Sequence, residues 1–279
     1  MARINIILQG FVDINLETDE NVNTKIGYKN NQTTTGSVNV DFNIQNLQGL
    51  RKSSTLPETI ELPTSLEVIF EKINMNIESA QAVHLQGSRL YEVNGINSDW
   101  DLAVISTDVN SYMFKEVNIE GNEFDIHLYT QENFQNKLDN HEIREFEFLY
   151  HPSNVIFVNN KSFSVDISNN KLINRVKVES DYLWNKAKTD LGSGVVDDYL
   201  SLKRVWHSFR FLIFAEQILK DGSITDFTAA NYLYESIVNS MQTDFEFFEL
   251  NFGTLRETLK LNLDTFKDDG GLELVEFQL

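Results

Sequence analysis

The sequence predicts an α/β (α+β) fold in which helices flank a small mixed sheet. Three observations support this prediction. Apolar residues alternate with other residues over parts of residues 1–60, as in strands. Short apolar runs and helical spacings are mixed over residues 61–168, and helical spacing dominates residues 169–279. We therefore expect a β-rich N-terminal extension, an α/β core and a helical C-terminal domain, with these three ranges as their bounds.

The N-terminal extension shows the period of two that strands have. A polar loop at residues 30–36 separates two alternating stretches, so we expect a hairpin or a small sheet. The alternating residues are Ile4, Ile6, Leu8, Val12, Ile14 and Leu16, and then Val38, Val40, Phe42 and Ile44.

The core begins with a helix near Thr64, which Thr64 or Ser65 can cap. Four strands and two helices follow. We expect strands at residues 82–85, 99–105, 122–129 and 154–158, and helices at 132–138 and 142–150. In the C-terminal domain we expect helix breaks at residues 192–194, 221–222 and 251–253, with the clearest helix at 195–220.

Composition narrows the class of protein. The 279 residues carry a formal net charge of −19 and no cysteine, which excludes disulfides and thiolate metal sites. Such an acidic chain does not suit the coating of long duplex DNA. No apolar run is long enough to span a bilayer, and the N-terminus lacks a signal-peptide pattern, so we expect no membrane partner and a cytoplasmic location, in the host if the gene is viral.

Two short motifs carry the chemistry. Asp99 and Asp101 are separated by one residue at the start of a strand, so they share a face and repel each other unless a cation binds between them. Gly87 and Ser88 follow an apolar run, where a turn into a helix exposes backbone N–H groups to phosphate. Taken singly, each motif is also compatible with an ordinary turn or with ordinary surface acids.

A third carboxylate changes this balance. Asp125 lies between Phe124 and Ile126, where a lone carboxylate is costly unless it is paired or binds a metal. Three carboxylates around one cleft could hold two Mg²⁺ ions and orient a triphosphate. Glu123 shares the face of Asp125 and is a weaker candidate for the same role.

These residues resemble a known signature. Gly87-Ser88-Arg89, followed by Gly95, Ser98 and Asp99-x-Asp101-Leu102, is similar to the nucleotidyltransferase signature of the DNA polymerase β superfamily. Later segments resemble a predicted bacterial and phage branch of that superfamily, so that the resemblance covers about residues 64–225. These segments are residues 122–129, Phe134, Leu138, residues 147–150, Lys203-Arg204-x-x-His207-x-x-Arg210 and Glu216-x-x-Leu219-x-x-Gly222.

The resemblance implies a nucleotidyltransferase core at residues 61–168 and a role for each matched residue. Ser88 would bind triphosphate, and Asp99 and Asp101 would ligate both metals. Asp125 would be the third metal ligand and the base for the incoming hydroxyl. The implied cofactor is Mg²⁺ or Mn²⁺, and the co-substrate is an NTP, with ATP as the first choice.

A basic stripe adds an independent argument. Lys203, His207 and Arg210 lie at i, i+4 and i+7 on one helix face, where they could meet a triphosphate or pair with surface acids. Arg89 could contact phosphate or form a salt bridge with Glu92. The predicted nucleotide-binding residues are Gly87, Ser88, Arg89, Lys203, His207 and Arg210. The histidines, His84, His127, His141, His151 and His207, show no zinc-site spacing.

The leading hypothesis is metal-dependent transfer of an NMP from an NTP to a hydroxyl, with release of pyrophosphate, in a cleft between the sheet and helix 195–220. The acceptor is open between an RNA 3′ end, a protein side chain and a small molecule, and the acidic charge favours the last two. The alternatives are a non-catalytic nucleotide-binding or interaction protein on the same scaffold and a structural protein with a Ca²⁺ site.

Overall fold

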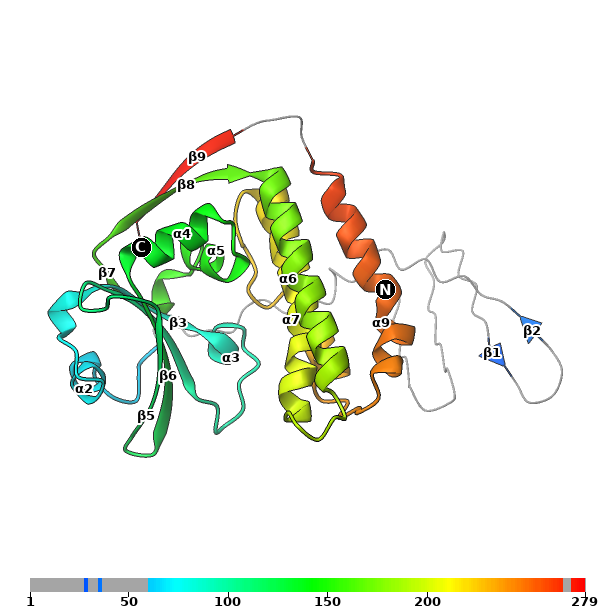
Figure 1. Cartoon of the computed structure of the whole chain (residues 1–279), viewed down its shortest axis with the longest axis horizontal. Coiled ribbons are helices and arrows are strands. Elements are labelled where there is room, and N and C mark those ends of the chain that lie inside the picture. The colour runs from blue at the N-terminus through cyan, green and yellow to red at the C-terminus, as the bar shows by residue number, and fades with distance from the viewer. Residues whose placement is uncertain (1–27, 30–34, 37–59, 268–271, 279) are drawn as a thin grey trace, which may run out of the picture. The chain divides into compact units, whose positions relative to one another are not determined.

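The computed structural model describes residues 28–29, 35–36, 60–267 and 272–278 (Figure 1). The chain divides into two compact units, Met1–Arg51 and Lys52–Leu279. All residues of the predicted site belong to the second unit.

The described residues of the first unit form a short antiparallel pair, β1 (Tyr28–Lys29) and β2 (Thr35–Gly36). The sequence prediction was wrong in placing residues 35–36 in a polar loop, because they form β2. The alternating stretches at residues 4–16 and 38–44 lie outside the described residues.

The second unit contains a five-stranded mixed sheet. Its strands are β3 (Ala80–Gln86), β4 (Trp100–Ser106), β5 (Met113–Ile119), β6 (Asn122–Tyr129) and β7 (Ile156–Asn159). The strand order is β5-β6-β4-β3-β7, in which β4 and β6 run parallel and the other neighbours run antiparallel. This sheet and the helices after it confirm the predicted mixed α/β fold class.

Helices surround the sheet and form most of the C-terminal part. The α-helices are α2 (Leu66–Lys72), α3 (Gly87–Leu90), α4 (Gln131–Asp139), α5 (Ile143–Leu149), α6 (Asn169–Asp190), α7 (Asp198–Asp221), α8 (Asn231–Ile237) and α9 (Phe245–Asp264). The described part of the chain also contains the 3₁₀ turns η1 (Ile77–Ser79) and η2 (Ser153–Val155). A separate two-stranded sheet pairs β8 (Ser162–Ser168) with β9 (Leu272–Gln278).

Burial explains why the central elements form where they do. Strands β3 and β4 are almost wholly buried, so their apolar runs are nearly continuous. Figure 1 places α2 on the opposite side of the sheet from α6 and α7. Helix α7 is apolar over most of its circumference, and α6 packs closely against it where Ser180 Oγ donates to the carbonyl of Ser208 at 2.8 Å. The α6–α7 pair therefore forms the packed centre of the helical part.

Several sequence predictions of elements need correction. Strands β5 and β8 were not foreseen, because their exposed faces carry charged and polar residues that weaken the apolar alternation. The C-terminal segment was expected to be helical, but β9 is a strand. The helix break expected at residues 251–253 is absent: α9 runs through Gly253, because buried Phe248, Phe252 and Leu259 hold the helix against its neighbours.

No helix within the described ranges combines the length and the apolar character that a membrane crossing requires. The division of the chain into three parts at residues 60 and 168 stays a prediction.

Candidate functional site

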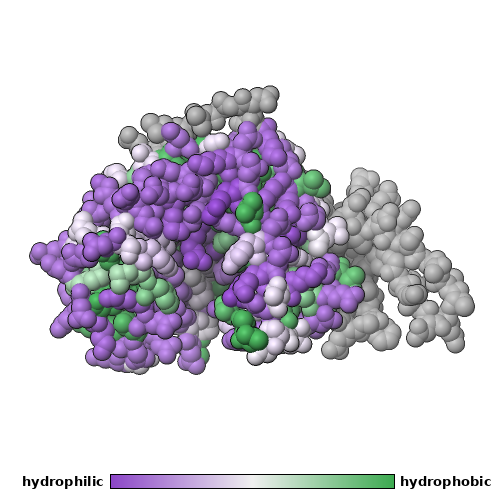
Figure 2. Space-filling view, viewed as in Figure 1, coloured by the Kyte–Doolittle hydropathy of each residue, from purple (hydrophilic) through white to green (hydrophobic). Residues whose placement is uncertain are grey.

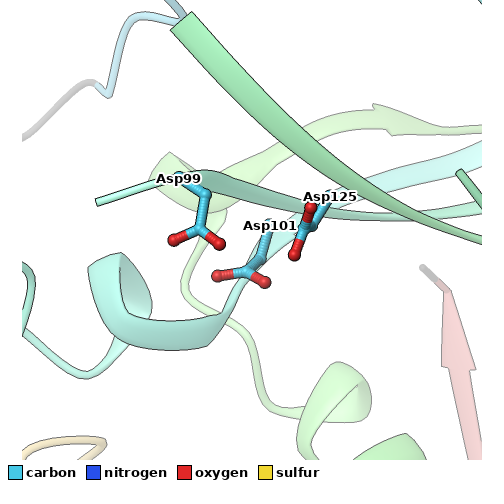
Figure 3. A group of neighbouring side chains, drawn as sticks. All are labelled: Asp99, Asp101 and Asp125. Atoms are coloured by element: carbon cyan, nitrogen blue, oxygen red, sulfur yellow. The ribbon is translucent and has the colours of Figure 1, made fainter. Parts of the chain in front are cut away.

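Three carboxylates meet at the start of the two parallel strands. The register of β4 and β6 sets Asp101 directly beside Asp125, and Asp99 immediately precedes β4. One oxygen of each carboxylate lies within 4.8 Å of an oxygen of the other two. Figure 3 shows the three side chains directed into one shared space. The structure thus brings together the three acids that the sequence singled out.

The three carboxylates are electrostatically frustrated without a cation. Burial, followed by the charges of Asp99 and Asp125, raises the pKa of Asp101 to about 7. Burial, followed by the charges of Asp99 and Glu116, raises the pKa of Asp125 to about 6. A divalent cation ligated by all three groups would remove this repulsion, and oxygen ligands of this kind are those that Mg²⁺ and Mn²⁺ take.

Gly87 lies against the carboxylate of Asp101. Its φ is +70°, and a Cβ built on it would stand 1.9 Å from Asp101 Oδ2. Any side chain at position 87 would therefore displace a carboxylate of the cluster. The sequence predicted that Gly87 lets a phosphate come close to the backbone. The structure gives a further reason for glycine here, because the backbone of residue 87 itself lies close to Asp101.

Arg89 anchors the segment that carries Asp99. Its Nε donates to the carbonyl of Asp99 at 3.1 Å, its Nη2 donates to the carbonyl of Ser98 at 2.5 Å, and the guanidinium lies 4.0 Å from the ring centroid of Trp100. These contacts fix the backbone before β4. Contact of Arg89 with phosphate stays a prediction.

A pocket opens next to the carboxylates. Its lining residues are Gln86, Gly87, Ser88, Tyr91, Val93, Asp101, His127, Arg144, Lys203, Trp206, His207, Arg210 and Tyr234. It encloses about 690 Å³ of empty space, a volume that includes open solvent, so it is an open cleft rather than a closed cavity. Figure 2 shows a hollow in the largely hydrophilic face between the sheet and the helical part. The pocket lies between the sheet and α7, where the sequence predicted the cleft.

The pocket presents polar groups that have no partner within the described part of the chain. Ser88 Oγ is buried and makes no hydrogen bond. Arg144 and Lys203 both line the pocket, and neither forms an ion pair with a described residue; Lys203 instead lies 4.7 Å from the ring centroid of Tyr199. A buried hydroxyl and two unpaired cations around one cavity suit a ligand with several negative charges. Since α3 is a single turn, its dipole adds little.

The other two residues of the basic stripe are arranged differently. Arg210 lines the pocket but is 2% exposed, and its Nη1 donates to Glu147 Oε2 at 2.9 Å. Its Nε donates to His207 Nδ1 at 3.1 Å. Arg210 is thus already paired with a buried carboxylate, whereas Lys203 is not. The helix face predicted from the spacing exists, but its cations differ in availability.

Arg144 is a charged pocket residue that the sequence did not single out. It lies on α5, whose sequence resembles an ordinary amphipathic helix, and 43 residues separate it from Asp101 by number. Only the packing of α5 in the folded chain brings it to the pocket that Lys203 also lines. A signal in the sequence was present: Arg144 is the one basic residue among the seven of this short, otherwise apolar and acidic helix.

The opposite flank of Asp125 is acidic. On β5, Glu116 pairs in register with Asp125, and on β6, Glu123 lies two residues before it, so both side chains share the face of Asp125. Both are exposed, and neither forms an ion pair with a described residue. Lys115 points to the other face, where its Nζ donates to the carbonyl of Ile73 at 2.5 Å. Charge is therefore segregated: cations line the pocket and acids border Asp125.

His127 lies between these two regions. It is in register with Phe114 on β5, its Nδ1 lies 2.7 Å from Tyr112 Oη, and it lines the pocket. Burial, followed by the charges of Arg144 and Lys137, lowers the pKa of His127 to about 4. His127 is therefore neutral at physiological pH.

Comparison with known proteins gives little. No family model and no curated protein matches the chain. Among solved structures, the chain is similar to a nucleotidyltransferase-like protein from Exiguobacterium sibiricum, at 13% sequence identity over 68% of this chain and 69% of that chain, with a TM-score of 0.26. A TM-score this low does not support an inference about function, so any functional inference rests on the geometry of the site.

Proposed function

We propose that this protein is a metal-dependent nucleotidyltransferase that moves an NMP from an NTP to a hydroxyl acceptor and releases pyrophosphate. The observation that carries this proposal is the juxtaposition of three mutually repelling carboxylates with a pocket that holds a buried, unpartnered Ser88 hydroxyl and two unpaired cations. A metal site and a polyanion site in direct contact suit a metal-bound triphosphate.

Each residue then has a role in the transfer. The triphosphate binds in the pocket, where Ser88 donates a hydrogen bond and Arg144 and Lys203 neutralise charge that grows on the leaving pyrophosphate. The acceptor oxygen forms a bond to the α-phosphorus, the bond to the bridging oxygen of pyrophosphate breaks, and Asp125 accepts the hydroxyl proton. Divalent cations held by Asp99, Asp101 and Asp125 would supply charge neutralisation and a lower pKa for the acceptor hydroxyl.

The acidic flank bears on the acceptor. In-line attack places the acceptor opposite the leaving pyrophosphate, hence away from Arg144 and Lys203. Glu116 and Glu123 border that side of Asp125 and would repel the phosphates of an RNA strand. We therefore favour a hydroxyl on a small molecule or on a protein side chain over an RNA 3′ end, and ATP is the first nucleotide to test.

The test is incubation of the protein with Mg²⁺ or Mn²⁺, each labelled NTP, and pools of small-molecule, protein and RNA acceptors. Pyrophosphate release and transfer of label are measured. The double variant Asp99→Ala plus Asp101→Ala should lose activity by a factor of about 10³ or more, because both metal ligands are removed. The control is Glu71→Ala plus Glu132→Ala, which removes two exposed acids outside the pocket and should keep full activity.

Pyrophosphate release that survives in the double aspartate variant would contradict the metal site. Metal-dependent ATP binding without label transfer to any acceptor would favour the non-catalytic nucleotide-binding alternative.

A further inference from the structure

A chain of hydrogen bonds runs behind the pocket and ends on His207. Tyr91 Oη donates to Glu147 Oε2 at 2.5 Å, and the same oxygen accepts from Arg210 Nη1 at 2.9 Å. Arg210 Nε in turn donates to His207 Nδ1 at 3.1 Å. The chain joins α5 to α7 and to the residue that follows α3.

The hydrogen-bonded residues behind the pocket are buried. Glu147 is 1% exposed, Arg210 is 2% exposed and Tyr91 is 4% exposed. The guanidinium of Arg210 also lies 3.9 Å from the ring centroid of Tyr91, so it is held by a carboxylate at one end and by an aromatic face. Because the guanidinium is a planar fork, fixing Nη1 on Glu147 also fixes the direction in which Nε points.

This arrangement determines which ring nitrogen of His207 carries the proton. The Nε of an arginine only donates, so His207 Nδ1 must accept and be unprotonated. In a neutral imidazole the proton is then on Nε2. Burial, followed by the positive charge of Arg210, holds the pKa of His207 well below its usual range, so the ring stays neutral.

The protonated nitrogen is available to a ligand. His207 lines the pocket together with Ser88, Arg144 and Lys203, and no described residue hydrogen-bonds to its Nε2. A neutral N–H donor beside two cations suits an anionic oxygen that those cations attract.

We propose that His207 donates an Nε2–H hydrogen bond to a phosphate oxygen of the bound nucleotide, and that Arg210 is the positioning residue that fixes this tautomer. Glu147 and Tyr91 hold Arg210 in place and do not contact the ligand. The proposal rests on the proposed function for the identity of the ligand, and on the hydrogen-bond chain for the tautomer. It changes the role of Arg210 from the phosphate ligand that the spacing predicted to a support for His207.

The first test reads the tautomer directly. In the full chain labelled with ¹⁵N-histidine, long-range proton–nitrogen spectra distinguish protonated from unprotonated ring nitrogens, and the signal lost in His207→Gln assigns His207. We expect an unprotonated Nδ1 and a protonated Nε2. Arg210→Lys keeps the charge but loses the Nε donor, so His207 should become a mixture of tautomers. The matched control is Arg204→Lys on the same helix, whose arginine pairs with Asp190 outside the pocket and should leave His207 unchanged.

The second test measures binding of Mg²⁺–tripolyphosphate and of a non-hydrolysable Mg²⁺–ATP analogue. Glutamine at position 207 can present an amide N–H where Nε2 stands, whereas leucine cannot. We expect His207→Gln to bind both probes within about threefold of the wild type, and His207→Leu to bind them at least about tenfold more weakly. His207 is half-buried, so these variants should fold even if Arg210→Lys is unstable, which thermal unfolding checks.

A wild-type His207 that is charged or protonated on Nδ1 would overturn the tautomer assignment. Equal binding of the glutamine and leucine variants, or no binding of tripolyphosphate by the wild type, would overturn the donor role. A wild type that shows the expected tautomer and binds tripolyphosphate in the expected order of variants would support the donor role, even if it transferred no nucleotide and so contradicted the proposed function.

Discussion

At the scale of single residues, Gly87 is the tightest steric constraint on the site. Gly87→Ala should abolish metal-dependent pyrophosphate release, because a Cβ would stand 1.9 Å from Asp101 Oδ2 and because φ of +70° disfavours alanine by about 1 kcal/mol. Gly95→Ala is the control: its Cβ would meet only Ser98 Oγ, at 3.9 Å, and its activity should stay near that of wild type. Equal activity of the two variants would show that Asp101 need not occupy its present position.

Asp101 should cost stability when no metal is bound. Its folded-state pKa of about 7 lies above the ordinary value of 3.8, so the folded protein holds a proton that the unfolded chain has lost. The stability contributed by this group is full below pH 4 and falls as pH rises from about 4 to 7. Asp101→Asn should therefore raise the free energy of unfolding of the metal-free protein at pH 8 by on the order of 2–4 kcal/mol.

Added Mg²⁺ should reduce the stability advantage of Asp101→Asn over the wild type. It should stabilise the wild type against thermal unfolding more at pH 8 than at pH 5.5, and it should stabilise Asp101→Asn much less, since one ligand and the repulsion that the ion relieves are both gone. A variant that is less stable than wild type without metal at pH 8, or that gains as much from Mg²⁺, would argue against the carboxylate cluster.

Two buried histidines should set the acid limit of the fold. The Nδ1 atoms of His84 and His151 lie 3.1 Å apart, and burial lowers the pKa of His84 to about 4. Because an unfolded histidine titrates near 6.5, the unfolded chain takes up protons first as pH falls. The stability that His84 contributes is full above pH 6.5 and is lost as pH falls to about 4.

The double variant His84→Phe plus His151→Phe removes this titration. The loss of unfolding free energy between pH 7 and pH 4.5, measured with urea, should be smaller than in wild type by on the order of 3 kcal/mol. Asp101 acts in the opposite direction over part of this range but is present in both proteins, so it cancels in the comparison. The same acid sensitivity in the variant would mean that other groups set the limit.

At the scale of elements, α5 and α7 each bring one unpaired cation to the pocket. Arg144→Gln and Lys203→Gln should each weaken binding of Mg²⁺–ATP by about tenfold, and the weakening should shrink as salt is raised, because the lost attraction is screened. Lys220→Gln, at the exposed end of α7, is the control and should bind as wild type does. Titration with a fluorescent ATP analogue measures all three, and unchanged affinity in both pocket variants would place the triphosphate elsewhere.

The elements that the sequence predicted are those in which burial imposes a clear pattern. Strand β6 alternates between buried Phe124, Ile126 and Leu128 and polar residues, and α7 repeats apolar residues at helical spacing. Strand β5 gives no such pattern, because it lies at the sheet edge and only Ile119 of its residues is buried. The sequence analysis expected Gly253 to break the helix. Glycine inside a helix costs only about 1 kcal/mol relative to alanine, and the packing of α9 outweighs this cost.

In the site, too, the residues that could be predicted are those marked by a local sequence pattern, and the others depend on contacts between distant segments. Asp99 and Asp101 are separated by one residue, and Asp125 lies on a recognisable strand, so local sequence patterns sufficed to single them out. Arg144 reaches the pocket only through the packing of α5, and the pairing of Arg210 with Glu147 joins residues 63 positions apart. Spacing along one helix predicts that side chains share a face, but it does not predict which of them are already paired.

At the scale of the whole unit Lys52–Leu279, the distribution of charge is more informative than its sum. A chain of net charge −19 repels a polyanion over most of its surface, yet Arg144 and Lys203 gather where Ser88 has no partner. The pocket would thus attract a triphosphate, provided that a metal neutralised the three carboxylates beside it. The metal and the nucleotide should therefore bind cooperatively.

A crystal soaked with Mn²⁺ and a non-hydrolysable ATP analogue tests this central claim most directly. The account predicts an anomalous peak at about 2.0–2.2 Å from carboxylate oxygens of Asp99, Asp101 and Asp125, with the triphosphate against Ser88, Arg144 and Lys203. Mn²⁺ and nucleotide at any other place, with the three carboxylates unligated, would contradict it.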